Sequence, residues 1–82
     1  MTTHTVIDNA PSTGLHIISA AGNQTFSVGE GSSEGWTLYQ SKTFGNMQGI
    51  LAASALFRNT AVGEVTTLIV ETSASEIVEG QL

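Results

Sequence analysis

The sequence predicts a small, mainly β domain, folded as an antiparallel sandwich or barrel-like sheet of about four to six short strands. Glycine recurs throughout the 82 residues and divides them into segments of strand length. Several of these segments alternate apolar and polar residues, which is the period of a half-buried strand. No segment repeats at a fixed interval, so a repeat architecture is not expected. The whole chain, residues 1–82, is expected to form a single β-rich domain.

The first three strands are expected in the N-terminal third of the chain, at residues 3–7, 15–20 and 24–28. Residues 8–14 separate the first two, because Asp, Asn, Pro, Ser and Gly all favour turns. Gly22 and Asn23 separate the second strand from the third, so we expect these two strands to pair as a hairpin. In the third strand, Phe26 and Val28 share one face.

The middle of the chain is expected to contain a flexible loop, a strand and a short helix. Residues 29–35 hold three glycines and no large apolar side chain, which predicts the loop. Residues 36–44 read as a strand, with Trp36 on one face and Tyr39 on the other. In residues 50–57 the alanines favour helix, while the length also suits a strand buried on both faces. We predict a short helix there.

The clearest strand is expected near the C-terminus, at residues 65–72, where β-branched residues are abundant. Apolar side chains occupy both of its faces, with Ile69 on one and Leu68 and Val70 on the other. This pattern predicts a central strand or one that lies in an interface. Residues 73–82 follow with acidic side chains and are expected to be a frayed end or an arm that reaches a neighbour.

Charged residues are scarce, since Asp, Glu, Lys and Arg make up 11% of the chain, against about a quarter of a typical soluble domain. Lys42 and Arg58 are the only basic residues, and seven acidic ones give a net charge of −5. Two isolated cations cannot track a phosphate backbone or hold an anionic membrane, so neither is an expected partner. The weakly charged exterior of so small a domain instead predicts that another protein covers part of it.

The sequence gives little information on location. No stretch approaches the roughly 20 apolar residues that cross a bilayer, and the first residues lack the basic start and apolar run of a secretory signal. Synthesis in the cytoplasm is therefore expected, with incorporation into a virion as one destination. The chain has no cysteine, so neither a disulfide nor a thiolate metal site is expected.

Two short motifs resemble phosphate-binding loops without meeting their requirements. Residues 29–35 place Glu34 where the dinucleotide fingerprint needs its third glycine, and this carboxylate would repel a pyrophosphate. Ser41-Lys42-Thr43 lacks the glycine before the lysine that lets backbone amides cradle a phosphate. We expect no cofactor and no small-molecule substrate.

Side chains suited to catalysis or metal binding are equally few. A serine-histidine-carboxylate arrangement would need His4 or His16 together with Asp8, the only aspartate. Nothing around them resembles a nucleophile elbow, and His16 stands in an apolar run that is typical of a structural histidine. The two histidines share no ligand spacing with a carboxylate cluster. The sequence therefore predicts a protein that is not an enzyme and holds no metal.

A protein–protein interface is the remaining expectation. Aromatic side chains dominate buried contacts, and Trp36 and Phe44 fit either a core or an interface. Tyr39 lies on the opposite face of the same predicted strand, which makes it the better interface candidate. The predicted interface residues are Tyr39, Thr37, Leu68, Val70 and Leu82.

Two functions from different classes fit these features. The first is a non-enzymatic structural subunit that associates with copies of itself or docks on a larger protein lattice, as virion decoration, cement and tail-accessory proteins do. The alternative is a small acidic inhibitor, such as an anti-defence protein that occupies a basic cleft on a host enzyme. Binding of such an inhibitor should weaken as salt is raised, while apolar association should persist.

Overall fold

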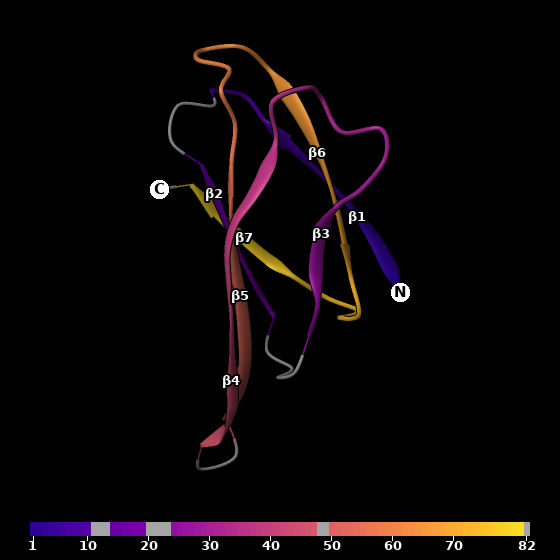
Figure 1. Ribbon diagram of the computed structural model, residues 1–82, viewed down its shortest axis with the longest axis vertical. Helices are drawn as coiled ribbons and strands as arrows, with labels where there is room; N and C mark the ends of the chain where they lie inside the picture. The colour runs from indigo at the N-terminus through magenta and orange to yellow at the C-terminus, as the bar shows by residue number, and fades with distance from the viewer. Residues whose placement is uncertain (11–13, 20–23, 48–49, 82) are drawn as a thin grey trace.

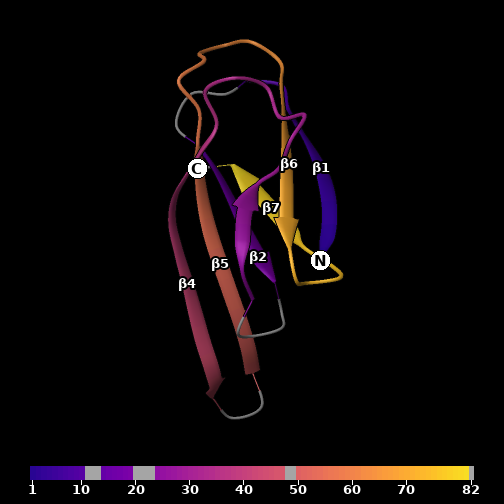
Figure 2. The same ribbon diagram turned by 45° about the vertical axis from the view of Figure 1, so that its right-hand side comes forward.

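Two antiparallel sheets pack face to face in the computed structural model, which describes residues 1–10, 14–19, 24–47 and 50–81 (Figures 1 and 2). Seven strands form the sheets, and these residues contain no helix. The strands are β1 (Thr2–Asp8), β2 (Leu15–Ser19), β3 (Phe26–Val28), β4 (Thr37–Met47), β5 (Ile50–Arg58), β6 (Thr66–Thr72) and β7 (Val78–Gln81). The predicted mainly β fold is confirmed, with one strand more than expected.

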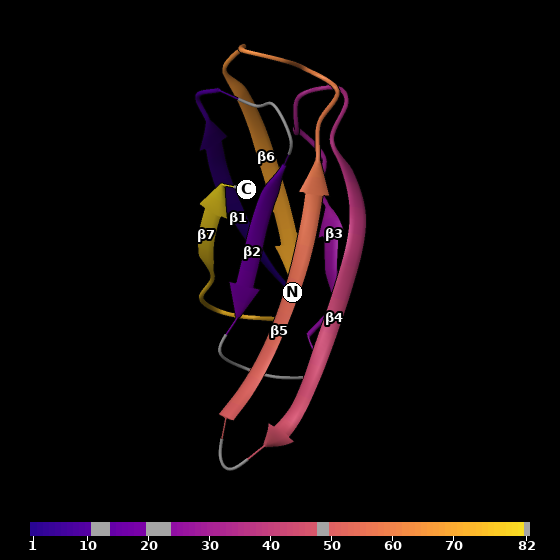
Figure 3. The same ribbon diagram turned by 90° about the vertical axis from the view of Figure 1, so that its left-hand side faces the viewer.

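The smaller sheet has the order β1-β6-β3 and the larger sheet the order β4-β5-β2-β7, and every pairing is antiparallel. β4 and β7 are therefore the edges of the larger sheet and run in opposite directions (Figure 3). β4 is the longest strand, with 11 residues. At about 3.4 Å per residue it spans nearly the whole long axis of 40 Å. The β4–β5 hairpin extends beyond the other strands at one end (Figure 1).

Alternation along the strands fills a single core between the two sheets. Phe57, Leu68 and Val70 point inward and are 0% exposed, whereas their neighbours Leu56 and Ile69 are only partly covered. The core consists of Val6, Leu15, Ile17, Phe26, Trp36, Ala53, Ala55, Phe57, Leu68 and Val70. Trp36 thus belongs to the core, while the surroundings of the other aromatic core candidate, the Phe44 side chain, lie outside the described part of the chain.

The helix predicted at residues 50–57 is wrong, because this segment is strand β5. Alanine favours helix by at most about 0.7 kcal/mol over most other residues. β5, however, lies between β4 and β2 and pairs with both. Ala53, Ala55 and Phe57 point into the core, and Arg58 ends the strand in solvent. Pairing on two sides and burial of one face therefore decide the conformation against the local preference.

The hairpin expected between the second and third strands is also wrong, because β2 and β3 belong to different sheets. β2 pairs with β5 and β7, and β3 pairs with β6. The turn residues predict correctly that the chain changes direction, but they carry no information on which strand becomes the neighbour. Phe26 enters the core from the smaller sheet and Ile17 from the larger one, so the two short strands close opposite sides of the same core.

The predicted flexible loop after β3 is tied to β6. Gly29 N donates a hydrogen bond to Ile69 O and Ser33 N donates one to Thr67 O, both at 2.7 Å. In return, Ser32 Oγ accepts from Ile69 N at 2.8 Å and Ser33 Oγ accepts from Thr67 N at 2.9 Å. Serine hydroxyls therefore satisfy backbone groups at the edge of β6 beyond the end of β3.

The predicted C-terminal arm, residues 73–82, joins the fold of its own chain as far as the structure describes it. Strand β7 pairs with β2 and closes the larger sheet. Ala74 is 3% exposed and Ile77 packs against the core, so the connection from β6 to β7 is anchored as well. A frayed end or a reaching arm is thus corrected to an edge strand.

Two buried threonines on β6 give predictions of opposite sign. Thr66 and Thr72 both face the core and are 6% and 0% exposed. Thr72 Oγ1 accepts a hydrogen bond from Ala74 N at 3.3 Å, whereas Thr66 Oγ1 has no hydrogen-bond partner among the described residues. We expect Thr72→Val to lower the free energy of unfolding by about 1–3 kcal/mol and Thr66→Val to raise it by roughly 1 kcal/mol. Urea unfolding of the two variants measures both changes, and a shared sign would contradict this account.

Candidate interaction surface

The outer face of the larger sheet is not covered by another strand of the described chain (Figure 3). Residues that pair directly across antiparallel strands present their side chains on the same face. Arg58 pairs with Thr37, and Ile18 pairs with Val78, which fixes the outward positions at the two edges. The outer face consists of Thr37, Tyr39, Gln40 and Lys42 from β4, Ser54, Leu56 and Arg58 from β5, His16 and Ile18 from β2, and Val78 from β7.

Apolar side chains cross the outer face from edge to edge. Tyr39 on β4 is 54% exposed, Ile18 on β2 is 41% exposed and Val78 on β7 is 69% exposed. Leu56 on β5 lies between them and is partly covered. Scattered apolar residues are normal on a surface, but a row of them across an open sheet is typical of a face that packs against another protein.

Tyr39 is held in place by its neighbours on the outer face. The ladder between β4 and β5 shifts register between Leu38 and Gln40, so Tyr39 stands at a β-bulge. The guanidinium carbon of Arg58 lies 3.6 Å from the centre of the Tyr39 ring, a cation–π contact of about 0.5–1 kcal/mol at an exposed site. Thr37 Oγ1 donates to Arg58 O at 3.5 Å. A restrained aromatic side chain loses little conformational freedom when a partner covers it.

Charge is distributed unevenly between this face and the rest of the chain. Residues 35–63 hold Lys42, Arg58 and no acidic residue, whereas the remainder holds all seven acidic residues and no Lys or Arg. The two parts carry +2 and −7, which give the net −5 of the whole chain. Among the described residues, the outer face therefore presents both cations and no carboxylate.

The predicted interface residues fall into three groups. Tyr39 and Thr37 lie exposed on the outer face, where an interface would need them. Leu68 and Val70 are 0% exposed and belong to the core, so their assignment to an interface is corrected. Leu82 lies outside the described residues.

Several residues of the outer face were not predicted from the sequence. Ile18, Leu56 and Val78 share their face with Arg58, whose charge must reach solvent. The position of Arg58 therefore marks which side of its strand points outward. In the same way Glu71 marks Thr67 and Ile69 as the outward positions of β6, which places Leu68 and Val70 in the core.

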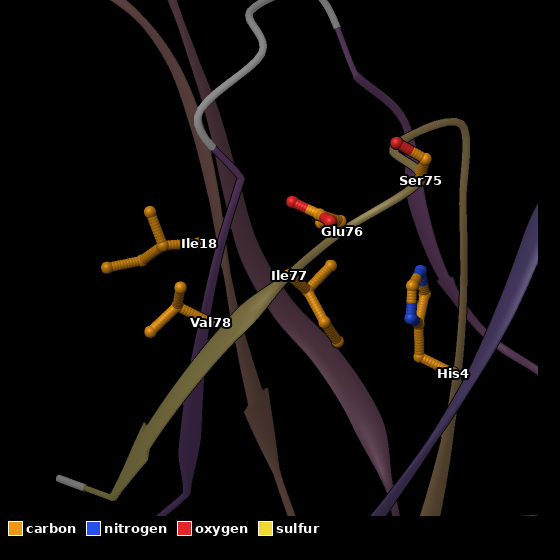
Figure 4. Close-up of a pocket in the computed structure, with 6 residues that line it drawn as sticks. All are labelled: His4, Ile18, Ser75, Glu76, Ile77 and Val78. Atoms are coloured by element: carbon orange, nitrogen blue, oxygen red, sulfur yellow. The ribbon is translucent and has the colours of Figure 1, made fainter.

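Two hollows lie on the side of the sandwich where the β1 and β7 edges face each other. The larger, about 400 Å³, is lined by His4, Ile18 and residues 75–78 (Figure 4). The smaller, about 240 Å³, is lined by Val6, Ile7, Asp8, Asn9, Ala10, Leu15 and Glu79. His4 Nε2 lies 3.1 Å from Ala74 O, and Asp8 Oδ1 accepts a hydrogen bond from Ala10 N at 3.2 Å. These contacts hold loop backbone in place.

The structure does not bring the candidate catalytic residues together. His4 lies on β1 in the smaller sheet, while His16 lies on β2 and points to the outer face of the larger sheet. Asp8 is 4% exposed at the end of β1. Within the described part of the chain, no three His, Cys, Asp or Glu side chains gather closely enough to hold a metal ion. The same residues include no helix able to span a membrane.

Comparisons with known proteins give no relative. The chain matches no protein-family model, no curated protein and no solved structure at a significant level.

Proposed function

We propose that this protein is a non-enzymatic structural subunit that associates with copies of itself within a larger protein assembly, in the manner of virion decoration, cement or tail-accessory proteins. The observation that carries the proposal is the outer face of the larger sheet. Tyr39, Ile18 and Val78 are exposed on it, and among the residues that the structure describes its charges are the two cations Lys42 and Arg58.

Association that covers Tyr39, Ile18 and Val78 would remove their exposed apolar surface from water. Each square ångström of apolar surface removed from water contributes about 25 cal/mol. Leu56 and Ile18 line the centre of the face, and Tyr39 and Val78 stand near its edges. An aromatic anchor with aliphatic neighbours and few charges is the composition found at the centre of protein–protein interfaces.

The alternative, an acidic inhibitor of a host enzyme, is less well supported. Such a protein needs its carboxylates gathered on one surface to match a basic cleft. Here the acidic residues are spread over both sheets and over loops at different places: Asp8, Glu30, Glu34, Glu64, Glu71, Glu76 and Glu79. No single face of the described sandwich collects them, so this arrangement favours the assembly function.

A charge placed at Tyr39 tests the proposal. We expect Tyr39→Asp to weaken self-association by at least about tenfold, because it buries a carboxylate in the contact and removes the aromatic anchor. The matched control is Thr5→Asp, which places the same side chain at an exposed position on the smaller sheet. Sedimentation equilibrium over the micromolar range gives the dissociation constants.

The control separates loss of the interface from a general effect of charge. Thr5→Asp should associate like the wild type, and both variants should retain the wild-type thermal melting temperature to within a few degrees. Equal association of Tyr39→Asp and wild type would contradict the assignment of the outer face. If both variants weakened self-association to the same extent, the change in net charge alone would explain the effect.

A further inference from the structure

We infer that the copies associate head to tail, with strand β4 of one copy set against strand β7 of the next, so that the larger sheet continues from subunit to subunit. This inference rests on the proposed self-association and names the two edges that meet; the outer faces of neighbouring copies then lie side by side, with Tyr39 and Val78 at the seam.

Strand direction permits this pairing without reversing a subunit. The larger sheet contains four strands that alternate in direction, so its two edges, β4 and β7, are antiparallel to each other (Figure 3). A second copy in a similar orientation, placed beside the first, therefore brings its β4 antiparallel to the β7 of its neighbour. Neither edge has another strand on its outer side among the described residues, so the backbone groups that would form the new ladder face away from the sheet.

Charge distinguishes this arrangement from the two symmetric ones. Lys42 lies on β4 and Arg58 beside it on β5, whereas Glu79 lies on β7 and Glu76 just before it. All four are exposed. Pairing β4 with a second β4 would bring cations together, and pairing β7 with a second β7 would bring carboxylates together. Only β4 against β7 avoids both like-charge contacts and brings the cations of one copy towards Glu76 of the next, which lines a hollow beside Ile18 and Val78. Glu79 pairs with the buried Ile17 and therefore lies on the inner side of β7, opposite to the face of Lys42.

The two edges differ in how they resist indiscriminate pairing. β4 carries Lys42 in its middle and a bulge at Tyr39, two features that protect an exposed edge strand from unspecific pairing. A partner edge with carboxylates relieves the effect of the lysine. β7 supplies such an edge. With four residues, Val78–Gln81, this strand is short enough to pair with β4 beside the bulge.

The apolar row continues across the proposed contact. Val78 stands on the outer face at the β7 edge, next to Ile18, and Tyr39 stands on the same face at the β4 edge. When β4 of one copy lies beside β7 of the next, the outer faces of the two sheets join. The Tyr39 of one subunit then comes near the Val78 of the other, which adds apolar contact to the backbone ladder.

A charge exchange tests the inference in the full-length chain. Lys42→Glu makes both edges acidic, and the double variant Glu76→Lys/Glu79→Lys makes both edges basic. Each variant alone should self-associate at least about tenfold more weakly than the wild type in sedimentation equilibrium. An equimolar mixture of the two should recover association to within about threefold of the wild type, because each β4 then meets a β7 of opposite charge. The double variant reverses the charge of Glu76, near the outer face, and of Glu79, on the inner side of β7, so the result does not depend on which face of this edge carries the attraction.

The matched control is Glu34→Lys/Glu64→Lys, which changes the net charge equally at two exposed loop positions away from β7. Mixed with Lys42→Glu, it should show less recovery than the β7 variant does. Circular dichroism of each variant confirms that the fold is retained.

The outcomes separate the two proposals. If the wild type and the β7 variant associate equally well, the head-to-tail contact is wrong, but the proposed self-assembly is still supported. Equal recovery with the loop control also overturns it, since net charge would then account for the effect. A wild type that stays at 8.5 kDa over the whole range overturns the self-assembly function and the contact together.

Discussion

Replacing Phe57 with alanine should lower the free energy of unfolding by about 3–5 kcal/mol. Phe57 is among the largest fully buried side chains and is 0% exposed in the middle of the core. Its strand, β5, lies between two others, so the surrounding backbone cannot collapse easily into the space that the ring leaves. At about 0.05–0.15 kcal/mol per residue, the whole chain has a stability of roughly 4–12 kcal/mol, and this single change removes a large part of it.

The matched control for Phe57 is the next residue towards the N-terminus. Leu56 points to the outer face of the same strand and is only partly covered. Leu56→Ala should therefore cost less than about 1.5 kcal/mol in the free energy of unfolding of the dissociated chain. Urea unfolding at low protein concentration, followed by the fluorescence of the single, buried Trp36, measures the free energy of unfolding of both variants. Equal destabilisation by the two substitutions would contradict the division between core and outer face.

Replacing Gly35 with alanine should lower the free energy of unfolding by about 2–4 kcal/mol. Gly35 has a φ of +96°, a conformation that costs other residues energy. A Cβ at this position would stand 2.7 Å from Asn59 Oδ1 and 2.6 Å from Thr60 Oγ1. Asn59 Oδ1 cannot move without cost, because it accepts a hydrogen bond from Ala61 N at 2.7 Å and the residue is 8% exposed.

Gly63 separates the two contributions to this effect. Its φ is also positive, at +74°, but a Cβ there would meet nothing within 4 Å. Gly63→Ala should therefore cost only the backbone strain, about 1–2 kcal/mol. Thermal unfolding of the two variants compares them. If Gly63→Ala destabilised the chain as much as Gly35→Ala, the contact of Gly35 with Asn59 would have no energetic role.

The fold class could be predicted from the sequence because its signals are local. Glycine spacing and β-branched segments place strands near residues 3–7, 15–20 and 65–72, and the structure has strands there. The partner of each strand could not be predicted, since it depends on which faces close the core together. The clearest cases are residues 50–57, which pair on both sides despite their alanines, and β7, which pairs with a strand some 60 residues earlier in the chain.

The candidate surface could be predicted only in part. The alternation around Trp36 indicates correctly that Tyr39 and Thr37 point away from the core. For residues 65–72 both faces are apolar, so alternation alone cannot say which one is buried. Glu71 resolves the question, because a carboxylate at an outward position assigns Leu68 and Val70 to the inward set. The bulge at Tyr39 and the contact with Arg58 depend on the pairing of β4 with β5 and have no local signal.

The charge distribution is compatible with the proposed self-association of a chain with net charge −5. Mutual repulsion between whole subunits acts over about a Debye length, roughly 8–10 Å at physiological salt. The inferred contact of β4 with β7 would bring the cations of residues 35–63 towards Glu76 of the next subunit, where short-range attraction would offset the screened repulsion. Scarce charge on the outer face and abundant charge elsewhere would thus favour contact on one side of the molecule.

Amide hydrogen exchange of the wild-type chain, compared between low and high micromolar concentration, tests most directly whether neighbouring copies cover the larger sheet. Amides of the two edge strands β4 and β7 should exchange more slowly at the higher concentration, while β1 and β3, the edges of the smaller sheet, serve as internal references and keep their rates. Exchange in β4 and β7 that does not depend on concentration would contradict this account, as would protection that appears at β1 and β3 instead.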